Sequence, residues 1–77
     1  MELKKGILFD YINLTYYVQD LLKIDGTNYL VALNYNDPKQ TDIFAYKFLG
    51  NVFMVRKIEE KQIIKNVLFN SLKKEVA

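Results

Sequence analysis

The chain has 77 residues, of which 51% are hydrophobic and 26% are charged, and its formal net charge is +2. A chain of this length holds one hydrophobic core, which predicts a single domain over residues 1–77, and the composition excludes a disordered tail. The absence of cysteine excludes disulfides and thiolate zinc sites, and the small net charge gives no reason by itself to expect a polyanionic partner.

The sequence also suggests where the protein works. It contains no apolar run of the roughly 20 residues that a membrane-spanning helix needs, and its beginning is too polar for a secretory signal. Together with the lack of cysteine, this favours a cytoplasmic protein that makes no contact with a membrane. The abundance of Lys, Asn and Ile suggests an AT-rich genome, and hence a bacterial or phage origin.

The first 24 residues fit two kinds of structure. Residues 6–12 look like a strand, whereas Leu14 and Val18 also fit a helical stripe. The β-branched and aromatic residues in this region favour a strand, and the Asp25-Gly26 pair that follows is typical of a tight hairpin turn, which needs an extended partner on each side. We therefore predict a strand over residues 15–24 and a turn over residues 25–28.

The strand predicted after this turn covers residues 29–35. Its alternation places Tyr29, Val31, Leu33 and Tyr35 on one face, which we expect to look toward the core. The polar residues 36–41 contain the only proline of the chain and predict a loop.

Two further strands and a helix complete the predicted fold. Residues 42–49 and 52–58 are rich in β-branched and aromatic residues, and Gly50-Asn51 between them predicts a second tight turn. From Glu59 onward the apolar residues recur at helical spacing, with acidic residues at the start and basic residues at the end, where the helix dipole favours them. These apolar residues are Ile63, Ile64, Val67, Leu68 and Leu72. The predicted fold class is α+β: a small antiparallel β-meander of four or five strands covered by a C-terminal α-helix.

The side chains that carry most enzyme chemistry are missing. The chain has neither histidine nor cysteine, so the commonest general base and the thiol nucleophile are absent. The adjacent Glu59 and Glu60 are expected at a helix start for electrostatic reasons, and Ser71 has no base nearby in sequence. The aspartates lack the spacing of a calcium loop, and there is no glycine-rich phosphate loop. We therefore expect no catalytic activity, no cofactor and no metal site.

Aromatic and basic residues are the strongest candidates for a binding site. Alternate residues of the strand predicted over 42–49 are aromatic on one face and mostly aliphatic on the other, so one apolar face is free to be exposed. Core packing is the simplest role for the aromatic residues, with a protein interface or a platform for nucleic-acid bases as alternatives. The basic residues that follow could contact phosphates, although a solvated helix face is simpler. The candidate binding residues are Phe44, Tyr46, Phe48, Arg56, Lys57, Lys61 and Lys65.

Three segments between Tyr17 and Leu72 carry a resemblance to a known family. They read LLKIDGTNYLV at residues 21–31, DIFAYK at residues 42–47, and IEE at residues 58–60 leading into VLFNSL at residues 67–72. This arrangement resembles a family of small uncharacterised proteins of Firmicutes, a domain of unknown function. The resemblance implies a Tyr-containing strand after the turn, an Ile-Phe strand and a closing helical segment, and it implies no activity.

The small size and the missing catalytic groups favour a non-catalytic protein-binding module or regulator, whose sheet face or edge docks on a larger protein. One alternative is a single-stranded nucleic-acid-binding domain that uses the sheet aromatics and the basic residues. Another is a structural homo-oligomer that buries its excess apolar surface by self-association.

Overall fold

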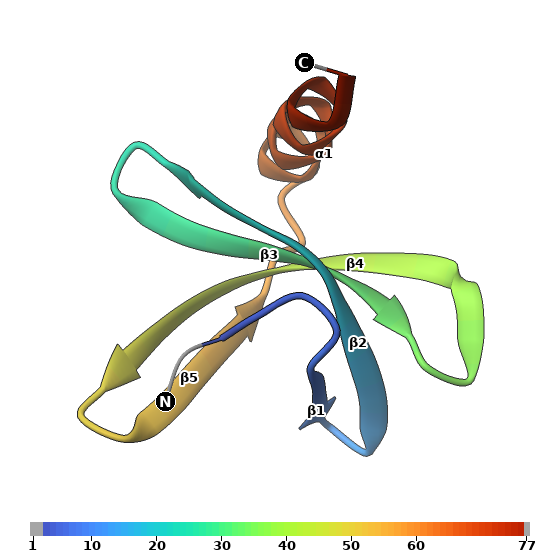
Figure 1. Cartoon of the computed structure of the whole chain (residues 1–77), viewed down its shortest axis with the longest axis vertical. Coiled ribbons are helices and arrows are strands. Elements are labelled where there is room, and N and C mark those ends of the chain that lie inside the picture. Colours follow the sequence, from blue (N-terminus) through green and yellow to red (C-terminus); the bar gives the residue numbers. More distant parts are fainter. Residues whose placement is uncertain (1–2, 77) are drawn as a thin grey trace.

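The computed structural model describes the backbone of residues 3–76 and the side chains of residues 3–74. Five strands are followed by one helix (Figure 1). They are β1 (Leu8–Tyr11), β2 (Leu14–Ile24), β3 (Thr27–Asn34), β4 (Asp37–Leu49), β5 (Val52–Lys57) and α1 (Lys61–Val76). Each strand pairs antiparallel with the next one in sequence, so the sheet order is β1-β2-β3-β4-β5. The predicted meander followed by a covering C-terminal helix is confirmed.

Two-residue turns set the register of the predicted hairpins. Asp25 and Gly26 have φ values of 50° and 81°, the left-handed conformation that a type I′ turn requires at both central residues. At the β4–β5 turn, Gly50 has a φ of 60°, which suits the first position of a type II′ turn. Both predicted turns are confirmed, although Thr27 and Asn28 belong to β3 rather than to the turn.

The segment predicted as a loop, residues 36–41, lies mostly in a strand. β4 begins at Asp37, and only Tyr35 and Asn36 form the turn. Residues 38–40 bulge out of the pairing, because Thr41 lies opposite Leu33 whereas Asp37 lies opposite Asn34. Pro38 is tolerated there because a bulged residue does not need to donate a hydrogen bond to the neighbouring strand.

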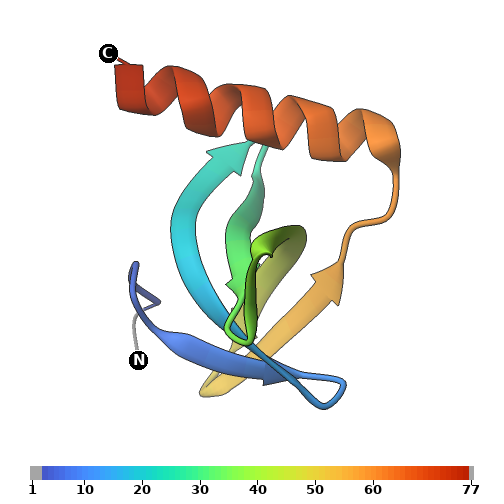
Figure 2. The ribbon, with the colours of Figure 1, turned by 90° about the vertical axis from the view of Figure 1, so that its right-hand side faces the viewer.

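Both faces of β3 are buried in its middle, so the prediction that one face of this strand looks inward was incomplete. Val31 packs under α1 as part of the predicted inner face, but Leu30 and Ala32 on the opposite face are also fully buried. In Figure 2 the long strands twist and curl into a half-barrel. Leu30 and Ala32 lie on its inner, concave face, and Val31 lies on its outer, convex face, under α1. Tyr35, which was predicted to look inward, lies in the turn and is exposed.

Aromatic side chains fill the concave face of the half-barrel. Phe9 on β1 lies with its ring centroid 5.6 Å from that of Tyr16, 5.3 Å from that of Phe44 and 5.9 Å from that of Phe53. Because Phe9 and Phe53 lie on the first and last strands, these contacts bring the two edges of the sheet toward each other. The concave core therefore draws on all five strands.

Helix α1 covers the part of the convex face that β2, β3 and the middle of β4 form. The carbonyl of Glu60 accepts hydrogen bonds from the N–H groups of Ile63 and Ile64. The helix begins at Lys61, two residues later than predicted, so Glu59 and Glu60 directly precede its first turn and do not belong to it. Val67 is buried against residues of β3 and β4. Leu72, predicted to belong to the buried stripe, is instead exposed, because it lies about 100° around the helix from Ser71, which faces the sheet. Within residues 3–76, no helix is both long enough and apolar enough to cross a membrane.

A buried carboxylate fastens the end of α1 to β2. The pairing of β2 with β3 shifts register between Val18 and Asp20, and Asp20 lies opposite Val31, on the face that α1 covers. Ser71 Oγ donates a 2.6 Å hydrogen bond to Asp20 Oδ2, and Lys74 Nζ donates one of 2.8 Å to Oδ1. Burial alone would raise the pKa of Asp20, but the hydrogen bonds from Lys74, Ser71 and the backbone N–H of Leu21 outweigh it and hold the pKa below its ordinary value.

Candidate binding surface

The three aromatic residues proposed from the sequence lie on the concave face. Phe44 is fully buried and makes edge-to-face contacts with Tyr11 and Tyr16, each with ring centroids 5.0 Å apart. Tyr46 and Phe48 are half-buried toward the β4–β5 turn and pack on each other with centroids 6.4 Å apart. Core packing therefore accounts for Phe44, which offers no ring face to a partner.

Lys57 joins a polar cluster on the same face. Its Nζ lies 3.7 Å from Asp42 Oδ1, while Asp42 Oδ2 accepts hydrogen bonds of 2.8 Å from the Tyr16 hydroxyl and 3.1 Å from Gln40 Nε2. Burial, together with the hydrogen bond to Asp42, raises the pKa of Tyr16 to about 12. Within this cluster Lys57 balances the charge of a partly buried carboxylate.

The other basic candidates lie elsewhere. Arg56 is on the convex face opposite Ala45, and its side chain is 66% exposed. Lys61 and Lys65 are exposed on α1. The seven predicted residues are thus divided among the concave face, the convex face and the helix, and the fold does not bring them together into one site.

The convex face of the β4–β5 hairpin carries an exposed apolar surface that the candidate list did not include. The register places Leu49 opposite Val52 and Lys47 opposite Met54. Leu49 is 57% exposed, Val52 61% and Met54 41%. We call the group formed by Lys47, Leu49, Val52, Met54 and Arg56 the β4–β5 patch.

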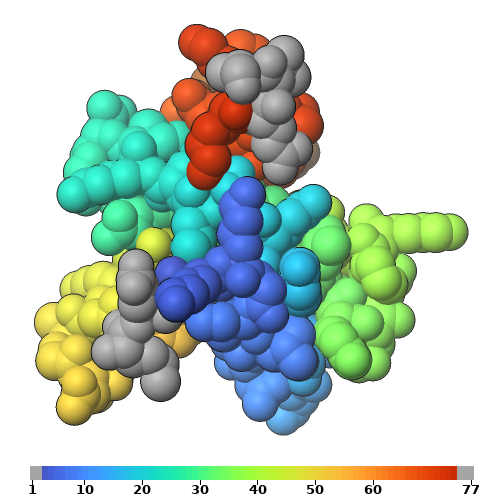
Figure 3. All heavy atoms as spheres, viewed as in Figure 1, coloured from blue at the N-terminus to red at the C-terminus, as the bar shows by residue number. Residues whose placement is uncertain are grey.

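The β4–β5 patch is exposed because α1 does not extend over this end of the sheet. The helix side of the sheet includes Ile43 and Ala45, nearer the start of β4, whereas Leu49 lies beyond them. In Figure 1 the β4–β5 hairpin projects away from α1, and in Figure 3 the same hairpin forms a separate lobe of the surface.

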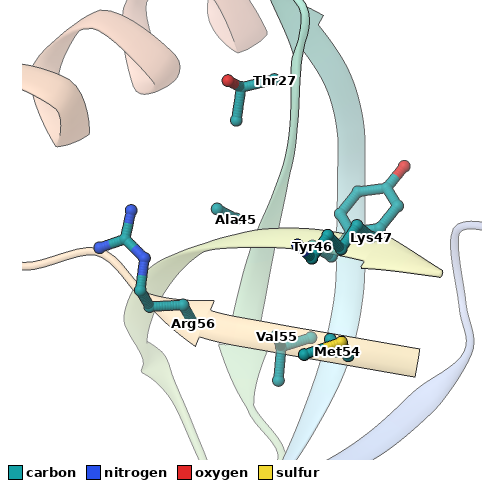
Figure 4. A pocket seen from close by; sticks show the side chains of 7 residues that line it. All are labelled: Thr27, Ala45, Tyr46, Lys47, Met54, Val55 and Arg56. Carbon is teal, nitrogen blue, oxygen red and sulfur yellow. The ribbon is translucent and has the colours of Figure 1, made fainter. Parts of the chain in front are cut away.

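An open groove runs alongside this surface (Figure 4). Its lining residues are Thr27, Ala45, Tyr46, Lys47, Met54, Val55 and Arg56. Figure 4 shows Arg56 and Lys47 on either side of Ala45, so the apolar floor lies between two cations, and the lining contains no acidic residue. A groove with this chemistry can hold an apolar side chain together with a carboxylate.

One sequence signal did point toward this surface. The strand predicted over residues 42–49 has apolar residues on both faces, which leaves one face free to be exposed. Leu49 lies on that second face. Nothing in the sequence indicated that Val52 and Met54 are exposed, because the alternation of side chains along a strand does not show which end of a sheet face a helix will cover.

Neither metal ligation nor similarity to known proteins adds to this picture. Within the part of the chain that the structure describes, no group of three or more acidic side chains could hold a metal ion. Comparison with protein-family models, with curated proteins and with solved structures found no match. The resemblance to the Firmicute family therefore stays a prediction, and any proposal on function rests on the geometry of the chain itself.

Proposed function

We propose that this protein is a non-catalytic protein-binding module that docks a larger protein through the β4–β5 patch. The observation that carries the proposal is the exposure of three large apolar side chains side by side on one end of the sheet: Leu49, Val52 and Met54. Covering such side chains removes apolar surface from water, which favours association. Grouped apolar residues with a polar rim are typical of interaction sites.

The charge around the patch favours an acidic partner segment. Between Lys47 and Lys57 the only charged residues are these two lysines and Arg56, all of them basic. Arg56 lies 3.8 Å from Glu60, but both side chains are more than half exposed, so this ion pair contributes little and leaves the guanidinium available. A segment that combines apolar side chains with carboxylates would match both the floor and the rim of the patch.

Binding to single-stranded nucleic acid is the less favoured alternative. Base stacking needs open ring faces next to a continuous basic track. Of the aromatic residues proposed for stacking, Phe44 is buried among other rings and Tyr46 and Phe48 are half-buried. The proposed basic residues lie on different surfaces, so they do not form one track. Structural self-association would use the same apolar surface and is distinguished by the oligomeric state.

Affinity capture with matched variants tests the proposal. The tagged chain is used to capture proteins from a lysate of a low-GC bacterium after nuclease treatment, alongside the double variant Leu49→Ser, Val52→Ser. We expect a stoichiometric protein partner that the wild type retains and the double variant loses, because the variant removes two apolar contacts from the patch.

The control variant is Phe69→Ser, Leu72→Ser on the outer side of α1. These side chains are 64% and 65% exposed, so the control removes a similar apolar area while leaving the β4–β5 patch intact. Circular dichroism is used to check that all three proteins are folded. A partner retained equally by the patch variant, or partners that vanish with nuclease treatment, would contradict the proposal.

A further inference from the structure

We infer that β5 is a docking edge, to which an extended acidic and apolar segment of the partner adds as a sixth strand. The inference rests on the proposed function, because the side chains of the added strand would lie next to the β4–β5 patch. It goes further by assigning the backbone of β5 as the main recognition element.

Among the residues that the structure describes, no backbone group pairs with the outer edge of β5. β5 is the last strand in the sheet order, and no strand within residues 3–76 pairs with its outer side. The N–H of Ile58 donates to the carbonyl of Ile43, so these two residues form a hydrogen-bonded antiparallel pair. Hydrogen-bonded and non-hydrogen-bonded pairs alternate along the ladder, so Arg56 and Met54 also bond to β4.

The residues between them point their backbone groups the other way. Phe53, Val55 and Lys57 form the non-hydrogen-bonded pairs with β4, and their N–H and C=O groups are directed outward. Three such residues, at every second position of β5, present the repeating pattern of donors and acceptors that an added strand needs.

β5 is also the better of the two sheet edges for such docking. It has 6 residues and contains no proline and no bulge. The opposite edge, β1, has 4 residues and ends at the turn formed by Ile12 and Asn13. A longer regular edge forms more hydrogen bonds with an added strand.

The basic residues of β5 favour an acidic strand as the one that pairs with its outer edge. The strand ends in Arg56 and Lys57 and has no acidic residue. Within the six residues of β5, pairing with the same strand of a second copy places no carboxylate opposite Arg56 or Lys57, so these cations gain no favourable contact, and basic residues on edge strands commonly oppose self-association. An acidic strand places a carboxylate opposite Arg56, whose side chain is 66% exposed, and a second one opposite Lys57, which also lies 3.7 Å from Asp42.

The register then specifies the partner segment. In an antiparallel arrangement, acidic residues come first, opposite Lys57 and Arg56, and apolar residues follow, opposite Val55, Met54 and Phe53. The apolar residue opposite Met54 lies on the convex side, where it extends the β4–β5 patch.

A synthetic peptide of this pattern, Ser-Glu-Glu-Val-Ile-Val-Ser with both ends blocked, provides the probe. In nuclear magnetic resonance experiments on the whole chain, we expect the peptide to slow the hydrogen exchange of the amides of Phe53, Val55 and Lys57. The amides of Met54 and Arg56 already bond to β4 and should change little. A control peptide with lysine in place of glutamate should bind about tenfold more weakly or worse.

The variant Val55→Pro removes one outward N–H without removing a hydrogen bond to β4, and Val55→Ala is its matched control. We expect Val55→Pro to weaken peptide binding about tenfold, and Val55→Ala to stay within about threefold of the wild type. If Val55→Pro fails to fold, the exchange measurement on the wild type decides the question alone.

The outcomes separate this inference from the proposed function. Peptide binding that is lost in Leu49→Ser, Val52→Ser but leaves the three β5 amides unprotected would overturn strand addition and leave the patch proposal standing. Absence of binding at about 1 mM peptide also overturns the inference. A dimer of the chain in sedimentation equilibrium that Val55→Pro dissociates would show that a second copy occupies the edge, and would overturn the acidic partner.

Discussion

Ile12 occupies a backbone conformation that suits asparagine or glycine far better than isoleucine. Its φ is 45° and that of Asn13 is 63°, so the turn between β1 and β2 has the type I′ form. A β-branched side chain is strained there, and it is also 75% exposed, so it gains little from burial. We expect Ile12→Asn to raise the free energy of unfolding by about 1 kcal/mol, measured by urea denaturation. Leu8→Asn on β1, at an exposed extended position, should give no such gain, and an equal gain would argue against relief of strain.

Tyr16 should make the fold lose stability at alkaline pH. Its pKa is about 12 in the folded protein, against an ordinary value of about 10. Between these values the folded state keeps a proton that the unfolded state loses, so the contribution is complete below pH 10 and is lost as the pH rises toward 12. We expect the free energy of unfolding to fall between about pH 10 and pH 12, and to fall less in Tyr16→Phe. An equal fall in Tyr16→Phe would mean that ionisation of Tyr16 is not what destabilises the fold.

At the scale of the elements, Asp20 connects β2 to α1. It accepts hydrogen bonds from Ser71 and Lys74 while being almost fully buried. Replacing it by asparagine leaves Lys74 without its counter-charge, and we expect Asp20→Asn to lower the free energy of unfolding by about 2–4 kcal/mol in urea denaturation. Asp10→Asn, which changes an exposed carboxylate bonded to Thr15, should cost about 0.5 kcal/mol or less.

Acid should remove the difference in the free energy of unfolding between the wild type and Asp20→Asn. The folded-state pKa of Asp20 lies below its ordinary value, so its stabilising contribution is present above an ordinary aspartate pKa of about 4 and is lost as the pH falls through the folded-state value. The stability gap between the wild type and Asp20→Asn should therefore narrow in acid. A gap that stays constant down to about pH 2 would mean that the charge of Asp20 is not what holds the helix.

Turns and strands were predictable from sequence because their signals are local. Asp25-Gly26 and Gly50 supply the positive φ values of two hairpin turns, and alternating β-branched and aromatic residues mark the strands between them. The start of β4 was missed because Pro38 and its polar neighbours are typical of a loop. Their strand conformation depends on a bulge in the pairing with β3, which is a non-local feature.

The binding surface was less predictable than the fold for a related reason. Sequence alternation identifies two faces of β4, but exposure depends on how far the sheet curls and where α1 lies across it. Phe44 and Leu49 are both apolar residues of the same strand, yet one is fully buried and the other is 57% exposed. Similarly, Ser71 and Leu72 are neighbours whose burial is the reverse of what their hydrophobicity suggests, because Asp20 lies beneath the serine.

At the scale of the whole molecule, two cores share one sheet. Leu30 and Val31 are consecutive residues of β3, and they point into the concave core and the core under α1 respectively. Neither core can be lost without disturbing the strand that supports the other. In a chain of this size, such sharing makes folding cooperative.

Val67→Ala tests this cooperativity from the helix side. Val67 is 1% exposed and packs with Val31 and Ile43, so its truncation should lower the free energy of unfolding by about 1–3 kcal/mol. Because the chain has no tryptophan, its fluorescence comes from tyrosines, of which Tyr11, Tyr16 and Tyr46 lie in the concave core and Tyr29 lies in the core under α1. Far-ultraviolet circular dichroism reports on sheet and helix together. We expect both signals to shift by the same amount in urea, although Val67 lies on the far side of the sheet from the tyrosines of the concave core. The control, Phe69→Ala, removes an exposed helix side chain and should leave both midpoints near the wild-type value. Separate transitions for the two signals would mean that the half-barrel remains folded after α1 has detached, and the sheet rather than the whole chain would then be the cooperative unit.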